Sequence, residues 1–237
     1  MNRGAFNMRF KPNKRTLFSL SLLIVLLLGA CGMNDASIGN SDAPIEEDDT
    51  VVAAVGDSIT NYSVTGANYP DHLEEMLGEG YSVLNFGEAN HAAQSSSDHP
   101  YETTASYEES LASEPDIIIF MLGTNDTKTE NWDNVETFKE EYTDLLEDYL
   151  QLDSVSRVIL ASPPSLFINS NIEGGIDDAQ IDKVGQVVEE VAEEYELEFV
   201  DVLDYTAGHD EWFFDGIHPN PEGAEELAGL FYEQIDQ

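Results

Sequence analysis

Short, largely apolar runs alternate with longer segments of helical periodicity from residue 51 onward. The short runs are rich in β-branched residues and lack the polar alternation of a strand with one solvated face, which is typical of strands covered by helices on both sides. We expect five such strands, at 51–55, 81–86, 116–122, 157–161 and 198–202. Strands that alternate with helices predict an α/β fold, a three-layer sandwich around a five-stranded, mainly parallel sheet.

Two segments between these strands carry apolar residues at intervals of three and four, the spacing of one helix face. The first stripe runs from Val135 to Tyr149 and the second from Ile181 to Tyr195. A last helix should begin after residue 220, because Asn220 can cap it and a proline follows in the first turn.

The first thirty residues have the composition of an export signal. Five basic residues precede an apolar run from Leu17 to Leu28, which is shorter than the roughly 20 residues that a membrane-spanning helix needs. Small residues then lead to Cys31, the only cysteine of the chain. This arrangement resembles the lipobox of bacterial lipoproteins, which implies a signal peptide at 1–30 and a lipid on Cys31. An ordinary signal peptide or an uncleaved anchor remains the alternative, and each places the domain outside the cytoplasm.

Residues 31–50 are polar and end in an acidic run, so we expect a flexible acidic tether before a domain at 51–237. The chain has 9 basic and 48 acidic residues, and five of the nine basic residues precede Cys31, which leaves four against 48, a net charge of −44. This charge disfavours nucleic acid and anionic lipid as partners. It also suggests a surface adapted to high ionic strength, where self-repulsion is screened.

Chemistry is expected at the carboxyl ends of the strands, where open α/β sheets bind their ligands. Polar and glycine residues follow three of the predicted strands and precede the last helix. These segments are Gly-Asp-Ser-Ile-Thr at 56–60, Asn-Phe-Gly at 85–87, Gly-Thr-Asn-Asp at 123–126 and Asp-Gly-Ile-His-Pro at 215–219. Each alone is an ordinary turn, but together they indicate one site.

The residue types in these segments fit nucleophilic catalysis. The hydroxyl of Ser58 needs a base, and histidine, here His218, titrates close to neutral pH. Asp215 lies three residues earlier and can accept the other ring N–H. Gly87 leaves room for a close approach, and Asn125 offers a neutral donor for a developing oxyanion.

The four segments resemble, in chain order, the Ser, Gly, Asn and His blocks of the SGNH hydrolases, also called GDSL esterases and lipases. The resemblance extends over the domain at 51–237 and implies a flavodoxin-like fold. It implies that Ser58 is the nucleophile, His218 the general base and Asp215 the residue that orients it. It also implies an oxyanion hole made by the amides of Ser58 and Gly87 and the side chain of Asn125.

The loop after the second strand departs from the family pattern. Related sequences commonly have a second glycine where Asn90 stands, although asparagine tolerates left-handed geometry better than most residues. His91 follows and can line the pocket, whereas His72, His99 and His209 are expected at the surface. We expect no metal and no cofactor, because the sequence has neither a His-Glu-x-x-His motif nor a pair of cysteines.

Residues 121–132 and the Pro163-Pro164 pair resemble the carbohydrate acetylesterase branch of the family. Together with the resemblance to a lipobox, this implies a secreted, lipid-anchored esterase on the outer face of the cell membrane, acting on small acyl groups, acetyl above all, of a carbohydrate. Trp132 or Trp212 can stack on a sugar, although both are also suited to a core. The alternatives are a lysophospholipase or thioesterase acting on longer acyl chains, and a non-catalytic binding lipoprotein.

Overall fold

The computed structural model describes residue 45 and residues 49–61, 68–168 and 175–237. The predicted signal peptide, Cys31 and nearly all of the predicted tether lie outside these residues. Among the helices within them, none has the length and apolar character needed to cross a membrane.

Five parallel strands form the sheet, in the order β2-β1-β3-β4-β5. They are β1 (Thr50–Gly56), β2 (Tyr81–Gly87), β3 (Ile117–Met121), β4 (Arg157–Ala161) and β5 (Glu198–Val200). The predicted strands are confirmed, with ends that differ by one residue in β1, β2 and β3 and by two residues in β5. β5 stops two residues early because the side chain of Asp201 accepts the amide of Asp204 and caps the next helix instead.

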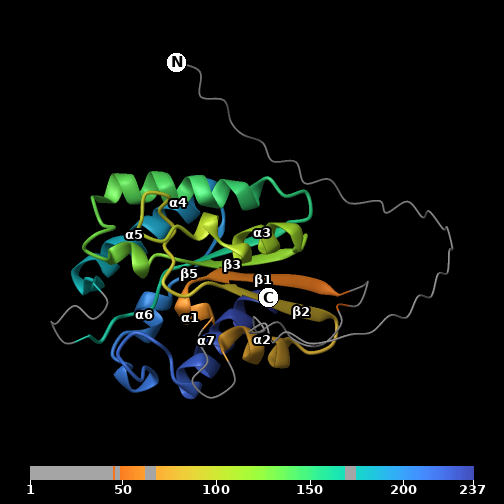
Figure 1. The fold of residues 1–237 in the computed structure, drawn as a ribbon. Coiled ribbons are helices and arrows are strands. Elements are labelled where there is room, and N and C mark those ends of the chain that lie inside the picture. The colour runs from red at the N-terminus through yellow and green to blue at the C-terminus, as the bar shows by residue number, and fades with distance from the viewer. Residues whose placement is uncertain (1–44, 46–48, 62–67, 169–174) are drawn as a thin grey trace, which may run out of the picture. The chain divides into compact units, whose positions relative to one another are not determined.

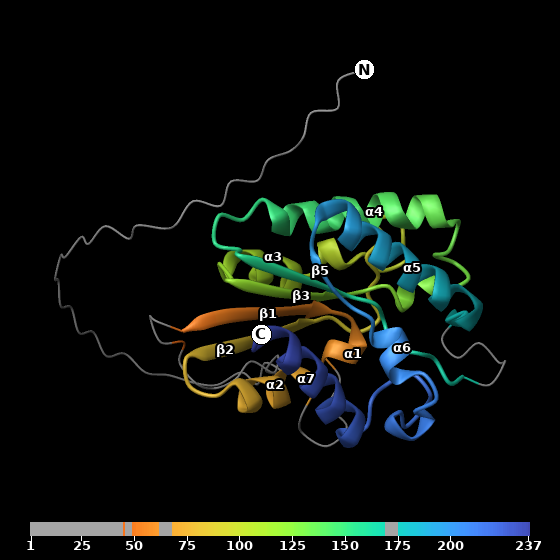
Figure 2. The ribbon, with the colours of Figure 1, turned by 180° about the vertical axis from the view of Figure 1, so that it is seen from behind.

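Helices cover both faces of the sheet, as Figures 1 and 2 show. They are α1 (Ser58–Asn61), α2 (Tyr69–Leu77), α3 (Ala105–Ala112), α4 (Val135–Leu150), α5 (Asp178–Tyr195), α6 (Val202–Thr206) and α7 (Pro221–Ile235), with short 3-10 turns η1 (Tyr101–Thr103), η2 (Asn125–Thr127) and η4 (Asp210–Trp212). One face carries α3, α4 and α5, and the other carries α2 and α7. The predicted three-layer α/β sandwich is confirmed.

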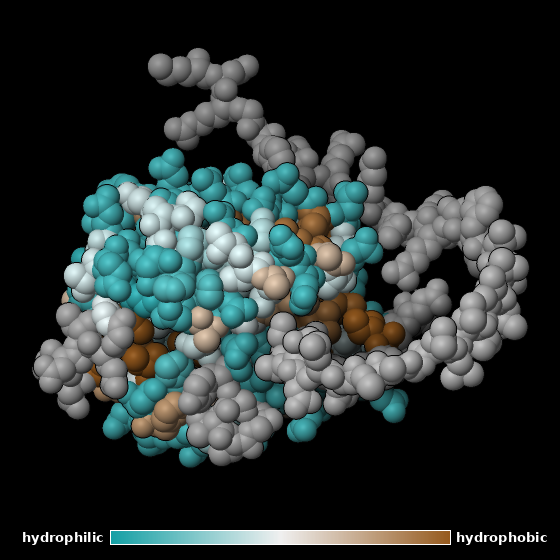
Figure 3. All heavy atoms as spheres, in the orientation of Figure 1, coloured by the Kyte–Doolittle hydropathy of each residue, from teal (hydrophilic) through white to brown (hydrophobic). Residues whose placement is uncertain are grey.

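Successive strand residues alternate between two apolar cores. In β1, Ala53 and Val55 belong to the core shared with α4 and α5, whereas Val52 and Ala54 belong to the core shared with α2 and α7. This is the period of two expected for a strand, and it explains why the strand sequences are apolar at nearly every position. Polar residues dominate the view of the surface in Figure 3.

The predicted helix starts are visible as caps. Oδ1 of Asn220 accepts the amide of Gly223 at 3.0 Å, and Pro221 is the first residue of α7. The apolar stripe that begins at Val135 became α4, and Asn134 caps it through the amide of Thr137. These caps fix where the chain turns back onto the sheet.

Candidate active site

Ser58 lies at the carboxyl end of β1, at the point where α1 begins. The turn between them is made by Asp57, whose Oδ1 accepts the amide of Ile59 at 2.9 Å and whose carbonyl accepts the amide of Asn61 at 3.0 Å. A β-carbon at Gly56 would collide with the side chain of Thr60, so the strand can bend here only with glycine. The turn holds Ser58, which is half-buried, at the carboxyl end of the strand.

The loop before α7 brings a histidine to this serine. Oδ1 of Asp215 accepts the amides of Ile217 at 2.9 Å and His218 at 2.8 Å, which folds the loop into a tight turn. Gly216 has a φ of +86°, a conformation that favours glycine. Nδ1 of His218 then lies 2.7 Å from Oδ2 of Asp215, and Nε2 lies 3.0 Å from Oγ of Ser58. The structure thus brings the three predicted residues into one hydrogen-bonded row.

The carboxyl of Asp215 is held in its ionised form. Burial opposes ionisation, but the amide and ring N–H groups of His218 and the amide of Ile217 outweigh it, and the pKa of Asp215 is lowered. An ionised carboxylate at Nδ1 fixes the ring orientation and stabilises a positive imidazolium.

Gly87 packs the end of β2 against α1. A β-carbon there would lie 2.5 Å from the backbone nitrogen of Asn61, and the Gly87 carbonyl accepts the side-chain amide of Asn61 at 2.7 Å. The Gly87 amide donates to Oδ1 of Asn85 at 2.9 Å. This amide would have to leave that partner to bind an oxyanion, so its role as an oxyanion donor stays a prediction that this geometry does not favour.

Asn125 reaches the same place from the neighbouring strand. It is the first residue of η2, after β3, and only 4% of it is exposed. Its Nδ2 donates to the His91 carbonyl at 3.0 Å and lies 3.5 Å from Oδ2 of Asp57, the residue before Ser58. One N–H is therefore fixed by His91, whereas the other has a partner at the limit of hydrogen-bonding distance and can turn to a new acceptor.

Two buried carboxyls beside the site were not singled out from the sequence. Asp57 directly precedes Ser58, and burial raises its pKa to about 6. Asp126 follows Asn125, and burial raises its pKa to about 7, although its oxygens accept the amides of Ala93 and Gln94. The sequence signal for both was their place inside the Gly-Asp-Ser and Gly-Thr-Asn-Asp segments.

The loop after β2 contacts the site through its backbone. Asn90 has a left-handed φ of +71°, the geometry for which asparagine is suited. The ring of His91 turns back to the Ala89 carbonyl at 2.8 Å, and the His91 carbonyl is the group that meets Asn125. His91 therefore shapes the site by its main chain.

The remaining histidines differ in how far they are exposed. His99 is exposed, as expected, whereas His72 and His209 are half-buried, and the ring of His209 stacks on Trp212 at 3.8 Å between centroids. Trp212 is buried and Trp132 packs against the core. In the ranges that the structure describes, no group of three or more His, Cys, Asp or Glu side chains is placed to hold a metal ion.

One large apolar ring lies beside the histidine. Phe214 is 46% exposed, and its ring stacks on that of His218, with the centroids 5.9 Å apart and the planes at 23°. It offers an aromatic face next to the reactive groups, which was not predicted from the sequence.

Comparison with known proteins agrees with this arrangement. Residues 54–226 match the model of the GDSL-like lipase/acylhydrolase family. The chain is 31% identical over 214 residues to an acetylxylan esterase from Xylanibacter ruminicola, covering 80% of this chain and 44% of that protein. It is 28% identical over 185 residues to a multidomain esterase from Ruminococcus flavefaciens, covering 74% and 22%. The chain therefore spans less than half the length of these two relatives.

A solved structure extends the comparison to the fold. A carbohydrate acetylesterase from Sinorhizobium meliloti superposes with a TM-score of 0.64 at 20% identity, covering 78% of this chain and 98% of that one. The family expected from the four sequence segments is confirmed by the match over residues 54–226. This chain belongs to the GDSL-like lipase/acylhydrolase family.

Proposed function

We propose that the protein is a serine esterase that removes small acyl groups, acetyl above all, from a carbohydrate. The observation that carries the proposal is the row of contacts from Oγ of Ser58 to His218 at 3.0 Å and on to Asp215 at 2.7 Å. A hydroxyl, a base and a carboxylate in this order are the groups that acyl transfer requires.

The reaction has two halves. In the first, Oγ of Ser58 attacks the ester carbonyl while Nε2 of His218 takes the hydroxyl proton, and Asp215 stabilises the imidazolium. The tetrahedral intermediate collapses, the C–O bond to the alcohol breaks, and His218 returns the proton to the departing oxygen. In the second half, His218 takes a proton from water, whose oxygen attacks the acyl-enzyme carbonyl. The bond between that carbon and Oγ of Ser58 then breaks, and His218 returns the proton to Oγ as the acid leaves.

The oxyanion needs donors that are already in place. Asn125 supplies the N–H that is only weakly engaged by Asp57 at 3.5 Å, and the Ser58 amide is the other donor that we assign. Both groups lie at the carboxyl ends of adjacent strands, β1 and β3.

The acyl group and the alcohol are assigned from likeness and from the surroundings of the site. The relative with 31% identity is named as an acetylxylan esterase. The His91 carbonyl in the loop after β2 accepts the side-chain amide of Asn125, and the exposed ring of Phe214 stacks on His218. Hydrogen-bonding groups together with an exposed aromatic face suit a sugar.

The test compares wild type with Ser58→Ala on nitrophenyl esters from acetate to decanoate and on acetylated xylan, with acetate release as the readout. We expect hydrolysis that falls sharply beyond butyrate and that Ser58→Ala abolishes. Faster hydrolysis of long chains would instead favour a lysophospholipase or thioesterase. A wild-type protein that hydrolyses no acyl ester would leave only the non-catalytic binding role.

We also propose export and lipid attachment at Cys31, followed by the acidic tether at 31–50. The support is the sequence alone: a basic start, an apolar run and small residues before the cysteine. Detergent phase partition of wild type and Cys31→Ser tests it, and equal recovery of both in the aqueous phase would refute the lipid anchor.

A further inference from the structure

We propose that Lys128 is a positioning residue of the esterase site, which holds the loop after β2 so that the His91 carbonyl orients the side chain of Asn125. This inference rests on the proposed function. Lys128, Asn90, Asp98 and Asn131 together are called the Lys128 clamp below. None of them belongs to the triad, and the clamp bridges two segments that each carry a part of the site.

The burial of Lys128 is the first observation. Of the four basic residues beyond Cys31, Lys128 is 3% exposed, whereas Lys139 and Arg157 are half-buried and Lys183 is exposed. A buried ammonium group is strongly unfavourable unless it is paired and hydrogen-bonded. The hydrogen-bond partners of Lys128 therefore show which segments this residue holds together.

Within the described part of the chain, the partners of Nζ come from the loop after β2. Nζ donates to Oδ1 of Asn90 at 2.7 Å, and it lies 3.4 Å from the Asn90 carbonyl and 3.5 Å from Oδ2 of Asp98. Lys128 itself follows η2, the turn that begins with Asn125. The ammonium group of Lys128 thus connects the segment after β3, which contains Asn125, to the loop after β2, which contains Asn90.

Asn131 forms the second arm of the clamp. Its Nδ2 donates to Oδ1 of Asp98 at 2.8 Å and to the Asn125 carbonyl at 2.9 Å, and its Oδ1 accepts the Asp98 amide at 2.8 Å. Burial opposes ionisation of Asp98, but the donors of Asn131, His99 and Lys128 outweigh it and lower its pKa to about 2. The carboxylate is therefore a fixed negative partner for the buried ammonium.

The contacts of the Lys128 clamp lead to the side chain of Asn125. Asn90 is held by Lys128 in a left-handed conformation, and the next residue, His91, offers its carbonyl to Nδ2 of Asn125 at 3.0 Å. That contact takes one N–H of Asn125 and so decides the direction of the other. Loss of the ammonium group would let Asn90 and the His91 carbonyl move, and the free N–H of Asn125 would move with them.

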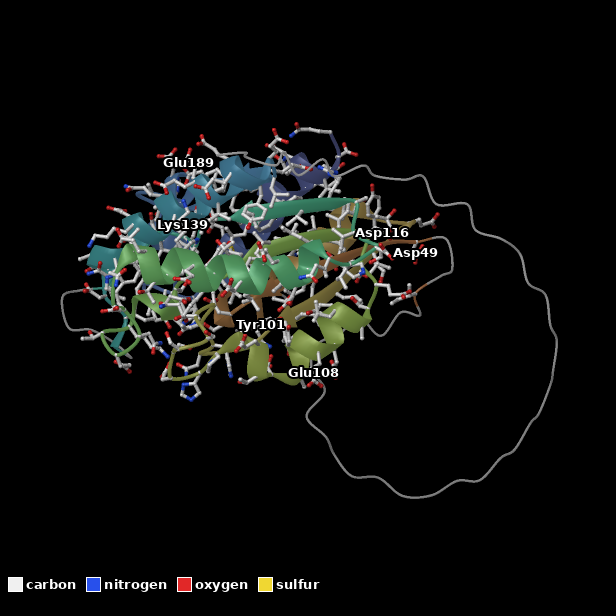
Figure 4. All side chains as sticks on the ribbon, turned by 90° about the horizontal axis from the view of Figure 1, so that it is seen from above. Asp49, Tyr101, Glu108, Asp116, Lys139 and Glu189 are labelled. Atoms are coloured by element: carbon white, nitrogen blue, oxygen red, sulfur yellow. The ribbon has the colours of Figure 1, made fainter. Side chains whose placement is uncertain are left out.

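The expected effect is kinetic, because Asn125 acts on charge that develops in the transition state. A misplacement of about 1 Å costs about 100-fold in rate. We expect Lys128→Ala to lower kcat on nitrophenyl acetate by about 100-fold, with KM within about twofold of wild type. Lys139→Ala is the matched control, since Lys139 on α4 (labelled in Figure 4) forms ion pairs with the exposed Glu190 and Glu194 of α5, and its kcat should not change.

A double-mutant cycle separates positioning from general support of the fold. If Lys128 acts through Asn125, Lys128→Ala combined with Asn125→Ala should be no slower than Asn125→Ala alone. Methylammonium ions should restore part of the kcat of Lys128→Ala and none of that of Asn125→Ala. The rates are taken per titrated active site, so that a loss of folded protein does not enter them.

A folded Lys128→Ala whose kcat stays within about threefold of wild type overturns the inference, and so do additive losses in the cycle. If Lys128→Ala does not fold, Asp98→Asn takes its place, because it neutralises the carboxylate at an exposed residue and should lower kcat by about tenfold with the same lack of additivity. An unchanged kcat in that variant overturns the inference equally. Wild type that hydrolyses no ester refutes the proposed function itself, whereas active wild type with equally active variants refutes only the clamp.

Discussion

The amide of Gly87 donates to Oδ1 of Asn85 at 2.9 Å, so the side chain of Asn85 binds the backbone at the end of the same strand, β2. The Gly87 carbonyl in turn accepts Nδ2 of Asn61, which ties β2 to α1. Gly87 thus lets β2 and the helix that begins with Ser58 approach closely, and its amide, which Asn85 already engages, stays a predicted donor to the oxyanion.

Gly87→Ala should lower both the stability of the protein and its rate of ester hydrolysis. The new β-carbon would lie 2.5 Å from the Asn61 nitrogen, a backbone atom that can move only if α1 moves. We expect a loss of about 1–3 kcal/mol in the free energy of unfolding, measured with urea, and a lower kcat. Gly229→Ala on α7 is the control, because its β-carbon would meet nothing within 4 Å, and it should be neutral or slightly stabilising. Wild-type stability in Gly87→Ala would contradict the close packing of β2 against α1.

Asp215→Asn should lower kcat by about 10⁴ with little change in melting temperature. The amide cannot stabilise the imidazolium, and it offers an N–H where Nδ1 of His218 needs an acceptor. Stopped-flow measurement of nitrophenol release checks this. Glu211→Gln removes an exposed carboxylate that is similarly paired with a histidine, His209, and should leave kcat unchanged. A loss below tenfold in Asp215→Asn would contradict the assigned role.

The buried carboxyl of Asp126 should make stability depend on pH. Its pKa rises from the ordinary 3.8 to about 7 on folding, so between these values the folded protein binds more protons than the unfolded chain. The contribution of Asp126 therefore falls as pH rises from about 4 to about 7, by up to about 1.4 kcal/mol per pH unit. Urea unfolding of wild type and Asp126→Asn should show a difference that shifts in favour of the variant across this range. A constant difference would contradict the raised pKa.

Added salt should stabilise the protein. The net charge of −44 beyond Cys31 repels itself more in the compact state than in the unfolded chain. The free energy of unfolding should increase with KCl concentration until about 1 M, where the Debye length is about 3 Å. Glu189→Gln with Glu193→Gln removes two exposed charges from α5 and should reduce this dependence, whereas equal stability at low and molar salt would refute it.

The sequence predicted what depends on long periodic patterns. α4 and α5 were expected from stripes of apolar residues, and β1 to β4 from apolar runs, because burial on one face or on both leaves a pattern that a window of residues reveals. The meeting of Ser58 and His218 was expected because Ser58 follows a strand at the edge where parallel sheets bind their ligands, and His218 directly precedes the last helix.

The features that the sequence did not predict depend on single side chains. Their partners are either distant in the sequence or are nearby backbone groups that compete with the regular structure. The end of β5 was set by the cap at Asp201, and the partner of the Gly87 amide was set by the orientation of Asn85. Lys128 joins Asn90 across 38 residues, which no local pattern reports. Contacts of this kind appear only when the fold is known.

His218 follows Ser58 by 160 residues, and the loop that carries it is followed directly by α7, which packs against α2 (Figure 2). During synthesis the nucleophile leaves the ribosome long before its base. The hydroxyl stays chemically idle until the final helix has docked on the sheet. The row of Ser58, His218 and Asp215 therefore forms only when the C-terminal part of the domain has folded onto the rest.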